Sequence, residues 1–196
     1  MPVRYDCHSG WLGADTSWQE GIPWWRPGSV QFVQDFFPEP IDVLEWGSGG
    51  STVWLARQGF NVTSIENNHD WAAQVRERLA NEGLLSRVNL LDFSPPDSQR
   101  MQEYADYPLG LPDDSFHLVC VDGRNRQRCV GNALGKVKVG GVMLLDNSER
   151  VEYADAVALM DTWDGIAWGD EGWMTTAWIR LLESVAARVE LPNADA

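Results

Sequence analysis

Residues 41–52 read IDVLEWGSGGST, and this stretch decides the fold. Its first half is an apolar run of strand length that ends at Gly47, and its second half is a loop of small residues that opens a helix at Thr52. Glycines in such a loop allow a tight turn and a close approach of the backbone to a ligand, while the free N–H groups of the following helix point at that ligand. We therefore expect a ligand-binding loop directly after the first strand of a sheet.

Strands and helices alternate on either side of this loop. The pattern predicts further strands over 61–66, 88–93, 116–121 and 142–146, and helices over 27–37, 52–57, 70–81, 126–138 and 153–160. Apolar strands separated by amphipathic helices indicate an α/β protein with a mostly parallel, Rossmann-like sheet and helices on both faces. A strand-like segment over 175–182, paired with one near 166–168, predicts an antiparallel edge at the C-terminal end of the sheet.

The chain divides into three parts by composition. Residues 1–26 form an N-terminal segment rich in aromatic side chains, which we interpret as a candidate lid. Residues 27–182 form a single domain, and residues 183–196 form a C-terminal tail. A chain of 196 residues is long enough to bury one substantial core.

Charge and composition exclude several classes of partner. The net charge is −14 and the pI is about 4.4, so the surface repels nucleic-acid backbones and anionic membranes. No apolar run reaches the roughly 18 residues that a membrane span needs, and the first eight residues lack the apolar core of a signal peptide. The three cysteines have no metal-type spacing. We expect an acidic cytoplasmic protein that acts on a small molecule, and the sequence carries no signal for its oligomeric state.

The residues that follow the predicted strands carry most of the chemistry. In open parallel sheets, ligands bind beyond the carboxyl ends of the strands. Those positions hold Glu45 with the loop 47–52, Glu66-Asn67, Asp92-Phe93, Asp122-Gly123-Arg124 and Asp146-Asn147. Because five successive strands end in polar or acidic residues, the sequence predicts one shared site.

Two classes of cofactor use a glycine loop of this kind. A dinucleotide site favours G-x-G-x-x-G, but Thr52 stands where the third glycine is required, and Glu45 would lie near a doubly negative pyrophosphate. S-adenosylmethionine has no phosphate, and its cationic amino and sulfonium groups suit a carboxylate at that place. Glu66, 21 residues after Glu45, can accept the ribose hydroxyls of either cofactor. The loop therefore favours S-adenosylmethionine.

The chain resembles the class I S-adenosylmethionine-dependent methyltransferases over roughly residues 30–181, in the segments LEWGSGGSTVWLA, SIENN, LVCVDGRNR and GGVMLLDNSER. The resemblance implies a Rossmann-like methyltransferase sheet with an antiparallel edge. It also implies that Glu66 binds the ribose, with Asn67 as a further cofactor-binding residue beside it, that Asp92 and Phe93 lie by the adenine, and that Asp122 lies by the methyl group as the candidate catalytic residue. The residues implied around the methionine half of the cofactor are Glu45, Gly47, Ser48, Gly49, Gly50, Ser51 and Thr52.

One group of residues raises the question of a metal ion. An acid after the fourth strand and an Asp-Asn pair after the fifth resemble the magnesium ligands of catechol-type O-methyltransferases; here they are Asp122, Asp146 and Asn147. Those enzymes carry a lysine three residues beyond the first aspartate, where this chain has Asn125. Arg124 and Arg126 flank that position and would repel a cation. We therefore expect no metal, with Asp122 orienting the substrate or cofactor, and we keep magnesium as the alternative.

Arginines and tryptophans mark the candidate substrate site. Arg124, Arg126 and Arg128 are either solvated charges at the start of a helix or a clamp for a carboxylate or phosphate of the substrate. The eleven tryptophans either pack in the core or form an aromatic wall around a pocket. We take Arg124, Arg126 and Trp24 as the candidate substrate-binding residues.

These patterns lead to one functional hypothesis and two alternatives. The hypothesis is an S-adenosylmethionine-dependent methyltransferase that transfers a methyl group to an oxygen or nitrogen of a small acceptor. One alternative is a methyltransferase-like domain that binds the cofactor without turnover. The other is an NAD-dependent oxidoreductase, which Thr52 and Glu45 disfavour.

Overall fold

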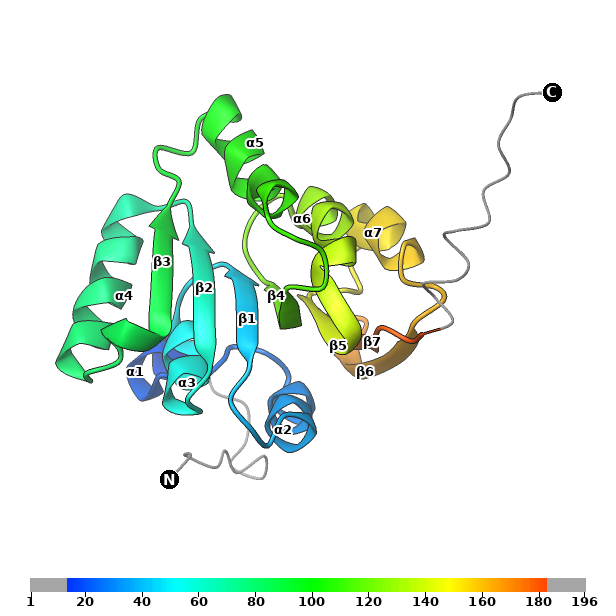
Figure 1. Ribbon diagram of the computed structural model, residues 1–196, viewed down its shortest axis with the longest axis horizontal. Helices are drawn as coiled ribbons and strands as arrows, with labels where there is room; N and C mark the ends of the chain where they lie inside the picture. Colours follow the sequence, from blue (N-terminus) through cyan, green and yellow to red (C-terminus); the bar gives the residue numbers. More distant parts are fainter. Residues whose placement is uncertain (1–13, 183–196) are drawn as a thin grey trace.

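A seven-stranded sheet forms the centre of the molecule (Figure 1). The computed structural model describes residues 14–182, so part of the candidate lid and the predicted tail lie outside the described residues. The sheet order is β3-β2-β1-β4-β5-β7-β6. The strands are β1 (Asp42–Trp46), β2 (Asn61–Glu66), β3 (Val88–Asp92), β4 (Phe116–Val121), β5 (Val137–Asp146), β6 (Asp164–Asp170) and β7 (Trp173–Ile179). Neighbouring strands among β1 to β5 pair in parallel, whereas β7 pairs antiparallel with both β5 and β6.

Helices cover both faces of this sheet. They are α1 (Ala14–Glu20), α2 (Pro27–Phe36), α3 (Gly50–Arg57), α4 (His69–Asn81), α5 (Ser98–Asp106), α6 (Arg126–Ala133) and α7 (Ala154–Ala158). Short 3₁₀ helices span Leu85–Arg87, Tyr107–Gly110, Leu134–Lys136 and Val151–Tyr153. In Figure 1, α5, α6 and α7 lie together along one side of the sheet, and α1, α2 and α3 lie on the other. Among residues 14–182, no helix has the length and apolar character that a membrane crossing requires.

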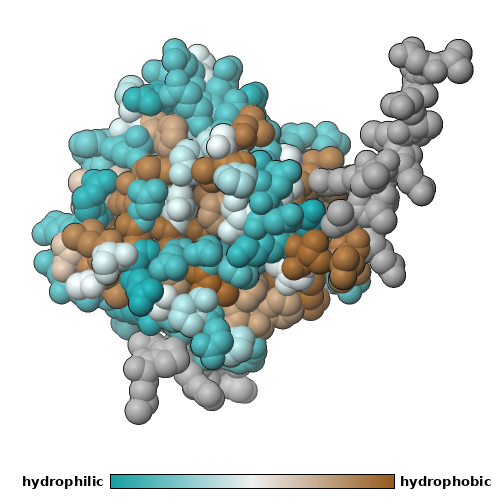
Figure 2. All heavy atoms as spheres, in the orientation of Figure 1, coloured by the Kyte–Doolittle hydropathy of each residue, from teal (hydrophilic) through white to brown (hydrophobic). Residues whose placement is uncertain are grey.

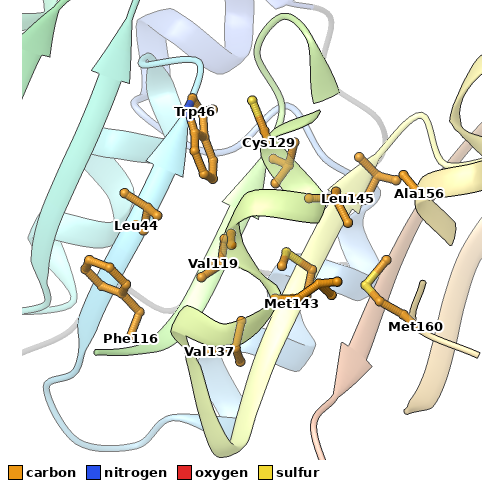
Figure 3. Close-up of a cluster of buried hydrophobic side chains, with 14 of the residues drawn as sticks. Leu44, Trp46, Phe116, Val119, Cys129, Val137, Met143, Leu145, Ala156 and Met160 are labelled. Carbon is orange, nitrogen blue, oxygen red and sulfur yellow. The ribbon is translucent and has the colours of Figure 1, made fainter. Parts of the chain in front are cut away.

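Alternation along the central strands builds a hydrophobic core on each face of the sheet. In β1, Leu44 and Trp46 pack with the α5–α7 side, whereas Val43 packs with α2 and α3. In β5, Leu145 joins the first core and Leu144 joins the second. Figure 3 shows the first core, with side chains of β1, β4 and β5 directed toward α6 and α7. Each aliphatic side chain buried in this way contributes about 1.5–3 kcal/mol to stability.

The surface is polar around these cores. In the space-filling view, hydrophilic residues cover the outer parts of this face of the molecule, and hydrophobic residues gather toward its middle (Figure 2). Cys120 and Cys129 are buried and not joined in a disulfide.

The predicted parallel sheet with an antiparallel edge is confirmed, and the largest difference in element bounds lies between α6 and β5. The helix predicted over 126–138 ends at Ala133, and the strand predicted to begin at residue 142 begins at Val137. Val137 pairs with Phe116 of β4, and Gly140 adopts a φ of +77° within the strand. Strand pairing at this point overrides the helical spacing of the apolar residues, because a paired strand satisfies the backbone hydrogen bonds that the helix would have made.

Helix α1 was not predicted from the sequence. It has only seven residues, and long-range hydrogen bonds hold its C-terminal end. Arg78 donates to the carbonyl oxygens of Trp18 and Gln19, and Arg57 donates to those of Glu20 and Gly21. Because side chains from α3 and α4 satisfy the free carbonyls, the local sequence gives little signal for the helix.

Trp46 and Trp54 provide a matched test of the buried hydrogen bonds in this fold. Both are buried, but the Trp46 indole N–H donates to the carbonyl oxygen of Tyr104 at 2.8 Å, whereas the Trp54 N–H has no partner among the described residues. We expect Trp46→Phe to lower the free energy of unfolding by about 1–3 kcal/mol more than Trp54→Phe, because it leaves a buried carbonyl unpaired. Urea denaturation of both variants measures this difference, and equal losses would contradict the assignment.

Candidate functional site

The carboxyl ends of the central strands border a cleft of about 1650 Å³. Ligand pockets usually measure about 300–1,000 Å³, so this cleft has room for a cofactor and an acceptor together. Five groups of residues line it: the loop 47–51, residues 66–71, residues 94–96 with Met101, residues 122–124 with Arg126, and residues 146–147 with Arg150. Side chains from the N-terminal segment and Trp173 complete the lining.

The glycine loop after β1 requires glycine at its first position. Gly47 has a φ of +88°, and a Cβ atom there would lie 2.8 Å from the carbonyl oxygen of Asp122. At Gly50 a Cβ atom would collide with the carbonyl oxygens of Ser17 and Ile22, because the N-terminal segment packs against the loop there. Gly49 differs, since a Cβ atom there would meet only Trp71, at 3.8 Å. Gly47 and Gly50 are therefore packed against the rest of the protein, whereas Gly49 faces the open cleft.

A buried carboxylate holds this loop from behind. Glu45 has no exposed surface, and its two oxygens accept hydrogen bonds from Ser51 Oγ at 2.5 Å, Thr52 Oγ1 at 2.6 Å and Ser64 Oγ at 2.6 Å. Thr52 Oγ1 also accepts from the backbone N–H of Gly49 at 2.8 Å. Burial raises the pKa of Glu45, and the three hydroxyl donors act in the opposite direction. Glu45 and Thr52, predicted as cofactor contacts, therefore lie behind the loop and do not line the cleft.

Glu66 lies at the cleft, as the end of β2 predicts. Its Oε1 accepts from the backbone N–H groups of Asn67 and Asn68, at 2.8 and 2.9 Å, and its Oε2 accepts from Ser48 N at 3.1 Å. Burial raises the pKa of this carboxyl, opposed by the same backbone donors. Because Oε2 takes one protein hydrogen bond, it keeps a lone pair for a ligand hydroxyl.

The end of β3 contributes to the cleft through its neighbours. Asp92 Oδ2 lies 2.6 Å from Nδ1 of His69, and its Oδ1 accepts from Ser94 N at 2.9 Å. Phe93 packs edge-on against Tyr104 and Tyr107 beside the α5–α7 core. Neither Asp92 nor Phe93 lines the cleft, although both were predicted near the adenine. The residues that do line this part, and that the sequence did not single out, are His69, Trp71, Ser94, Pro95, Pro96 and Met101.

The ends of β4 and β5 meet around Arg126. The side chain of Arg126 is 9% exposed, and its guanidinium donates to the Asp122 carboxylate at 2.8 Å and to Asn147 Oδ1 at 3.2 Å. Asp146 Oδ1 accepts from Trp173 Nε1 and Thr175 Oγ1. Burial and the nearby Asp146 raise the pKa of Asp122, and Arg126 opposes this shift. Within residues 14–182, no cluster of three or more His, Cys, Asp or Glu side chains has a metal-binding arrangement.

The other predicted substrate residues separate into two groups. Arg124 is exposed and lines the cleft, whereas Arg128 forms an ion pair with Asp106 at 2.6 Å and does not line it. Trp24 is 48% exposed at the cleft, and its ring lies 6.1 Å from that of Trp173. Both interpretations of the tryptophans therefore apply. The indoles that line the cleft are those of Trp18, Trp24, Trp71 and Trp173, and those of Trp25, Trp46, Trp54, Trp163 and Trp178 are buried.

Charge is distributed unevenly along the cleft. The acids Asp15, Glu66 and Asp70 lie in the N-terminal segment and after β2, where a cationic group would be favoured. Arg124 and Arg150 lie after β4 and β5, and the guanidinium of Arg150 is 4.0 Å from its nearest acid, Glu149. The cleft therefore has an acidic end beside the glycine loop and a basic end beside Arg126, where three arginines outnumber the acids Asp122 and Asp146.

Several solved structures with a similar fold are described as methyltransferases. A methyltransferase from Geobacter sulfurreducens matches with a TM-score of 0.60 and 16% identity over 79% of this chain and 78% of that chain. The O-methyltransferase TomG from Streptomyces achromogenes, in complex with S-adenosylmethionine, matches with a TM-score of 0.58 and 19% identity over 85% and 89%. An O-methyltransferase from Bacillus cereus, in complex with S-adenosylhomocysteine, matches with a TM-score of 0.59 and 16% identity over 86% and 82%. Comparisons with protein-family models and with curated proteins give no match. The chain thus has the Rossmann-like methyltransferase fold.

The raised pKa of Asp122 predicts a pH dependence of stability. Burial and Asp146 raise this pKa from 3.8 to about 8, so the folded state favours the protonated form. The stability linked to that proton is fully present below the pKa of the unfolded chain and is lost as the pH rises through the folded pKa. Between pH 5 and 9 we expect the free energy of unfolding of the wild type to fall by at least about 1.4 kcal/mol relative to that of Asp122→Asn, which is the equivalent of a shift of one pKa unit.

Urea denaturation across this pH range measures the effect. Asn at position 122 keeps an oxygen for Arg126 but does not titrate, so its curve should be flatter. Asp161→Asn, at an exposed carboxylate that does not line the cleft, is the matched control and should follow the wild type. Parallel curves for the wild type and Asp122→Asn would contradict the prediction.

Proposed function

We propose that this protein is an S-adenosylmethionine-dependent methyltransferase acting on an oxygen or nitrogen of a small acceptor. One observation carries the proposal: the glycine loop and the Glu66 carboxylate border the same open cleft at the carboxyl ends of β1 and β2. The fold supports it, because the solved structures that share it include methyltransferases in complex with S-adenosylmethionine or S-adenosylhomocysteine. A cytoplasmic location stays a prediction from the sequence.

The residues at the acidic end of the cleft fit this cofactor. Gly49 offers open space in which a backbone can approach a ligand, and Glu66 keeps a lone pair for a ribose hydroxyl. Asp15 and Asp70 favour a cationic amino acid group over a phosphate. Glu45 supports the site indirectly, by holding Ser51 and Thr52 in the loop. We further propose that residues 14–26 are part of a lid over this end.

Methyl transfer requires an aligned acceptor, removal of its proton and exclusion of water. When bound, S-adenosylmethionine supplies a methyl group on a sulfonium that leaves as a neutral thioether. Asp122 lines the cleft with 22% of its side chain exposed, and its raised pKa suits a group that accepts the acceptor's proton near neutral pH. Arg126 fixes the orientation of that carboxylate, and the indoles of Trp24 and Trp173 shield the basic end of the cleft from water.

Cofactor binding tests the proposal directly. Isothermal titration should give binding of S-adenosylmethionine, and Glu66→Ala should weaken it by about 1.5–3 kcal/mol because a charged acceptor is lost. Gly49→Ala should also weaken binding while leaving the unfolding curve nearly unchanged, since the new Cβ enters open space. Glu77→Ala, at an exposed glutamate of α4, is the matched control and should bind as the wild type does.

The alternatives give different results in the same experiments. An NAD-dependent oxidoreductase would bind NAD and not S-adenosylmethionine, which would overturn the proposal. A non-catalytic domain would bind S-adenosylmethionine but transfer no methyl group to any acceptor in a radiolabelled methyl-transfer assay.

The basic end of the cleft favours an acceptor that carries an anionic group and a flat ring. Arg124 is exposed there without a counter-acid among the described residues, and the paired indoles of Trp24 and Trp173 offer an aromatic surface. A hydroxybenzoate and its neutral hydroxybenzamide are suitable probes. We expect the acid to bind about tenfold more tightly than the amide, because a charge-assisted hydrogen bond contributes about 1.5–3 kcal/mol.

Tryptophan fluorescence titration in the presence of S-adenosylhomocysteine measures both affinities. Arg124→Ala should remove the preference for the acid, whereas Arg128→Ala, whose side chain is paired with Asp106 outside the cleft, should keep it. Equal affinity of the wild type for the acid and the amide would show that Arg124 does not select an anionic acceptor.

A further inference from the structure

The three candidate magnesium ligands predicted from the sequence come together at the ends of β4 and β5. Arg126, the first residue of α6, joins them. Its Nη2 donates to the carboxylate oxygen Oδ1 of Asp122 at 2.8 Å and to the Asp122 carbonyl oxygen at 3.0 Å. Its Nη1 donates to Asn147 Oδ1 at 3.2 Å and to the carbonyl oxygen of Asp146. The guanidinium therefore lies where a cation held by these residues would lie.

Every donor of this guanidinium is used within the protein. The remaining N–H, on Nε, donates to the carbonyl oxygen of Gly123 at 2.9 Å. Because a guanidinium has five N–H groups, these five contacts use all of them, and none is left for a substrate carboxylate. Arg126 therefore holds the loops of the site together instead of binding the substrate, and Arg124 remains the candidate substrate ligand.

One side-chain oxygen of each of the three candidate ligands is already occupied. Mg²⁺ requires an octahedron of oxygen ligands at about 2.0–2.1 Å. Asp122 Oδ1 and Asn147 Oδ1 accept from Arg126, and Asp146 Oδ1 accepts from Trp173 Nε1 at 3.0 Å and Thr175 Oγ1 at 2.5 Å. A divalent ion at this place would also be repelled by the guanidinium of Arg126, a residue that is 8% exposed and so poorly screened by water. The residues present do not fit a metal ion.

The surrounding backbone is shaped for this arrangement. Asn125, directly before Arg126, has a φ of +52°, and Asn147 has a φ of +53°. Asparagine adopts this left-handed conformation more readily than most residues other than glycine, so these two residues allow the tight turns on either side of the guanidinium. Arg126 contacts both loops, because it binds the Asn147 side chain and the carbonyl oxygens of Asp122 and Gly123 at the start of the β4–α6 turn. Its ring-face contact with Tyr153, at 5.7 Å, further restricts the guanidinium.

We propose that Arg126 is a built-in cation that takes the place of a divalent metal ion in this site and positions Asp122 toward the acceptor. The chemistry at Asp122 then proceeds without Mg²⁺. The role in positioning Asp122 rests on the proposed function, whereas the exclusion of a metal ion does not.

Binding of Mn²⁺, a spectroscopic substitute for Mg²⁺, tests the proposal on the full chain. Electron paramagnetic resonance should detect no Asp122-dependent Mn²⁺ site in the wild type at Mn²⁺ concentrations up to about 10 mM, which would fill even a weak site for a hard cation. Arg126→Ala vacates the position and should gain one Mn²⁺ site that Asp122→Asn removes again. The same ion should raise the unfolding midpoint of Arg126→Ala by about 3 °C or more and leave the wild type unchanged.

Two further variants control for folding and for general loss of charge. Arg126→Lys keeps a cation in the site, so it should stay folded and gain no Mn²⁺ site even where Arg126→Ala does not fold. Arg128→Ala, two residues along the same helix and paired with Asp106, should behave as the wild type. If methyl transfer is measured, Arg126→Lys should recover part of the activity that Arg126→Ala loses, with a shifted pH profile, because the ammonium still orients Asp122.

The outcomes separate this inference from the proposed function. A wild-type Mn²⁺ site that Asp122→Asn abolishes would overturn the inference, and so would a folded Arg126→Ala that gains none. Calorimetry of S-adenosylmethionine with the same wild-type sample reports on the proposed function alone. Absence of cofactor binding would therefore reject that function while the Mn²⁺ result still decides the status of Arg126.

Discussion

The carboxylate of Glu45 is the group on which the shape of the site depends. A carboxylate with no exposed surface is costly unless its oxygens are hydrogen-bonded, and here three hydroxyl groups supply those bonds. Two of the hydroxyls belong to the start of α3 and one belongs to β2, so the interaction joins the first strand, the glycine loop and the second strand. Thr52 connects the carboxylate to the loop backbone, because its hydroxyl oxygen also accepts a hydrogen bond from the backbone N–H of Gly49. A cofactor in the cleft would contact the loop, and Glu45 would affect binding only by holding the loop in place.

The sequence predicted what depends on local pattern. Apolar strands, amphipathic helices and glycine punctuation predicted an α/β sheet with an antiparallel edge, and the acid ending β2 was expected in the cleft where Glu66 lies. Contacts between distant segments were not predictable in the same way. Whether Glu45 faces a ligand or its own loop depends on Ser64, a residue of another strand, and whether Phe93 faces the cleft or the core depends on Tyr104 and Tyr107. Helix α1 escaped prediction for the same reason, since arginines of α3 and α4 hold its end.

The distribution of charge in the cleft separates two tasks. Acids near the glycine loop favour a cationic partner, and arginines after β4 and β5 favour an anionic one. Arg126 lies among the acids Asp122 and Asp146 and offsets part of their charge, which lets two carboxyl groups approach each other without a metal ion. A chain with a net charge of −14 thus has a basic surface at this end of the cleft, where it would attract an anionic group. Pairing of Arg128 with Asp106 leaves Arg124 as the exposed member of the predicted cluster at the cleft.

The close approach of the N-terminal segment at Gly50 affects which ligands the start of α3 can bind. Helix N-termini attract phosphate because their first N–H groups are free and carry partial positive charge. At α3 the carbonyl oxygens of Ser17 and Ile22 crowd the position beside Gly50, so partial negative charge already faces the opening of that helix. A phosphate bound near Gly50 would be repelled by this partial negative charge, whereas an ammonium group would be attracted to it. These main-chain carbonyls therefore favour a cationic group over a phosphate at this end of the cleft, whatever side chains surround them.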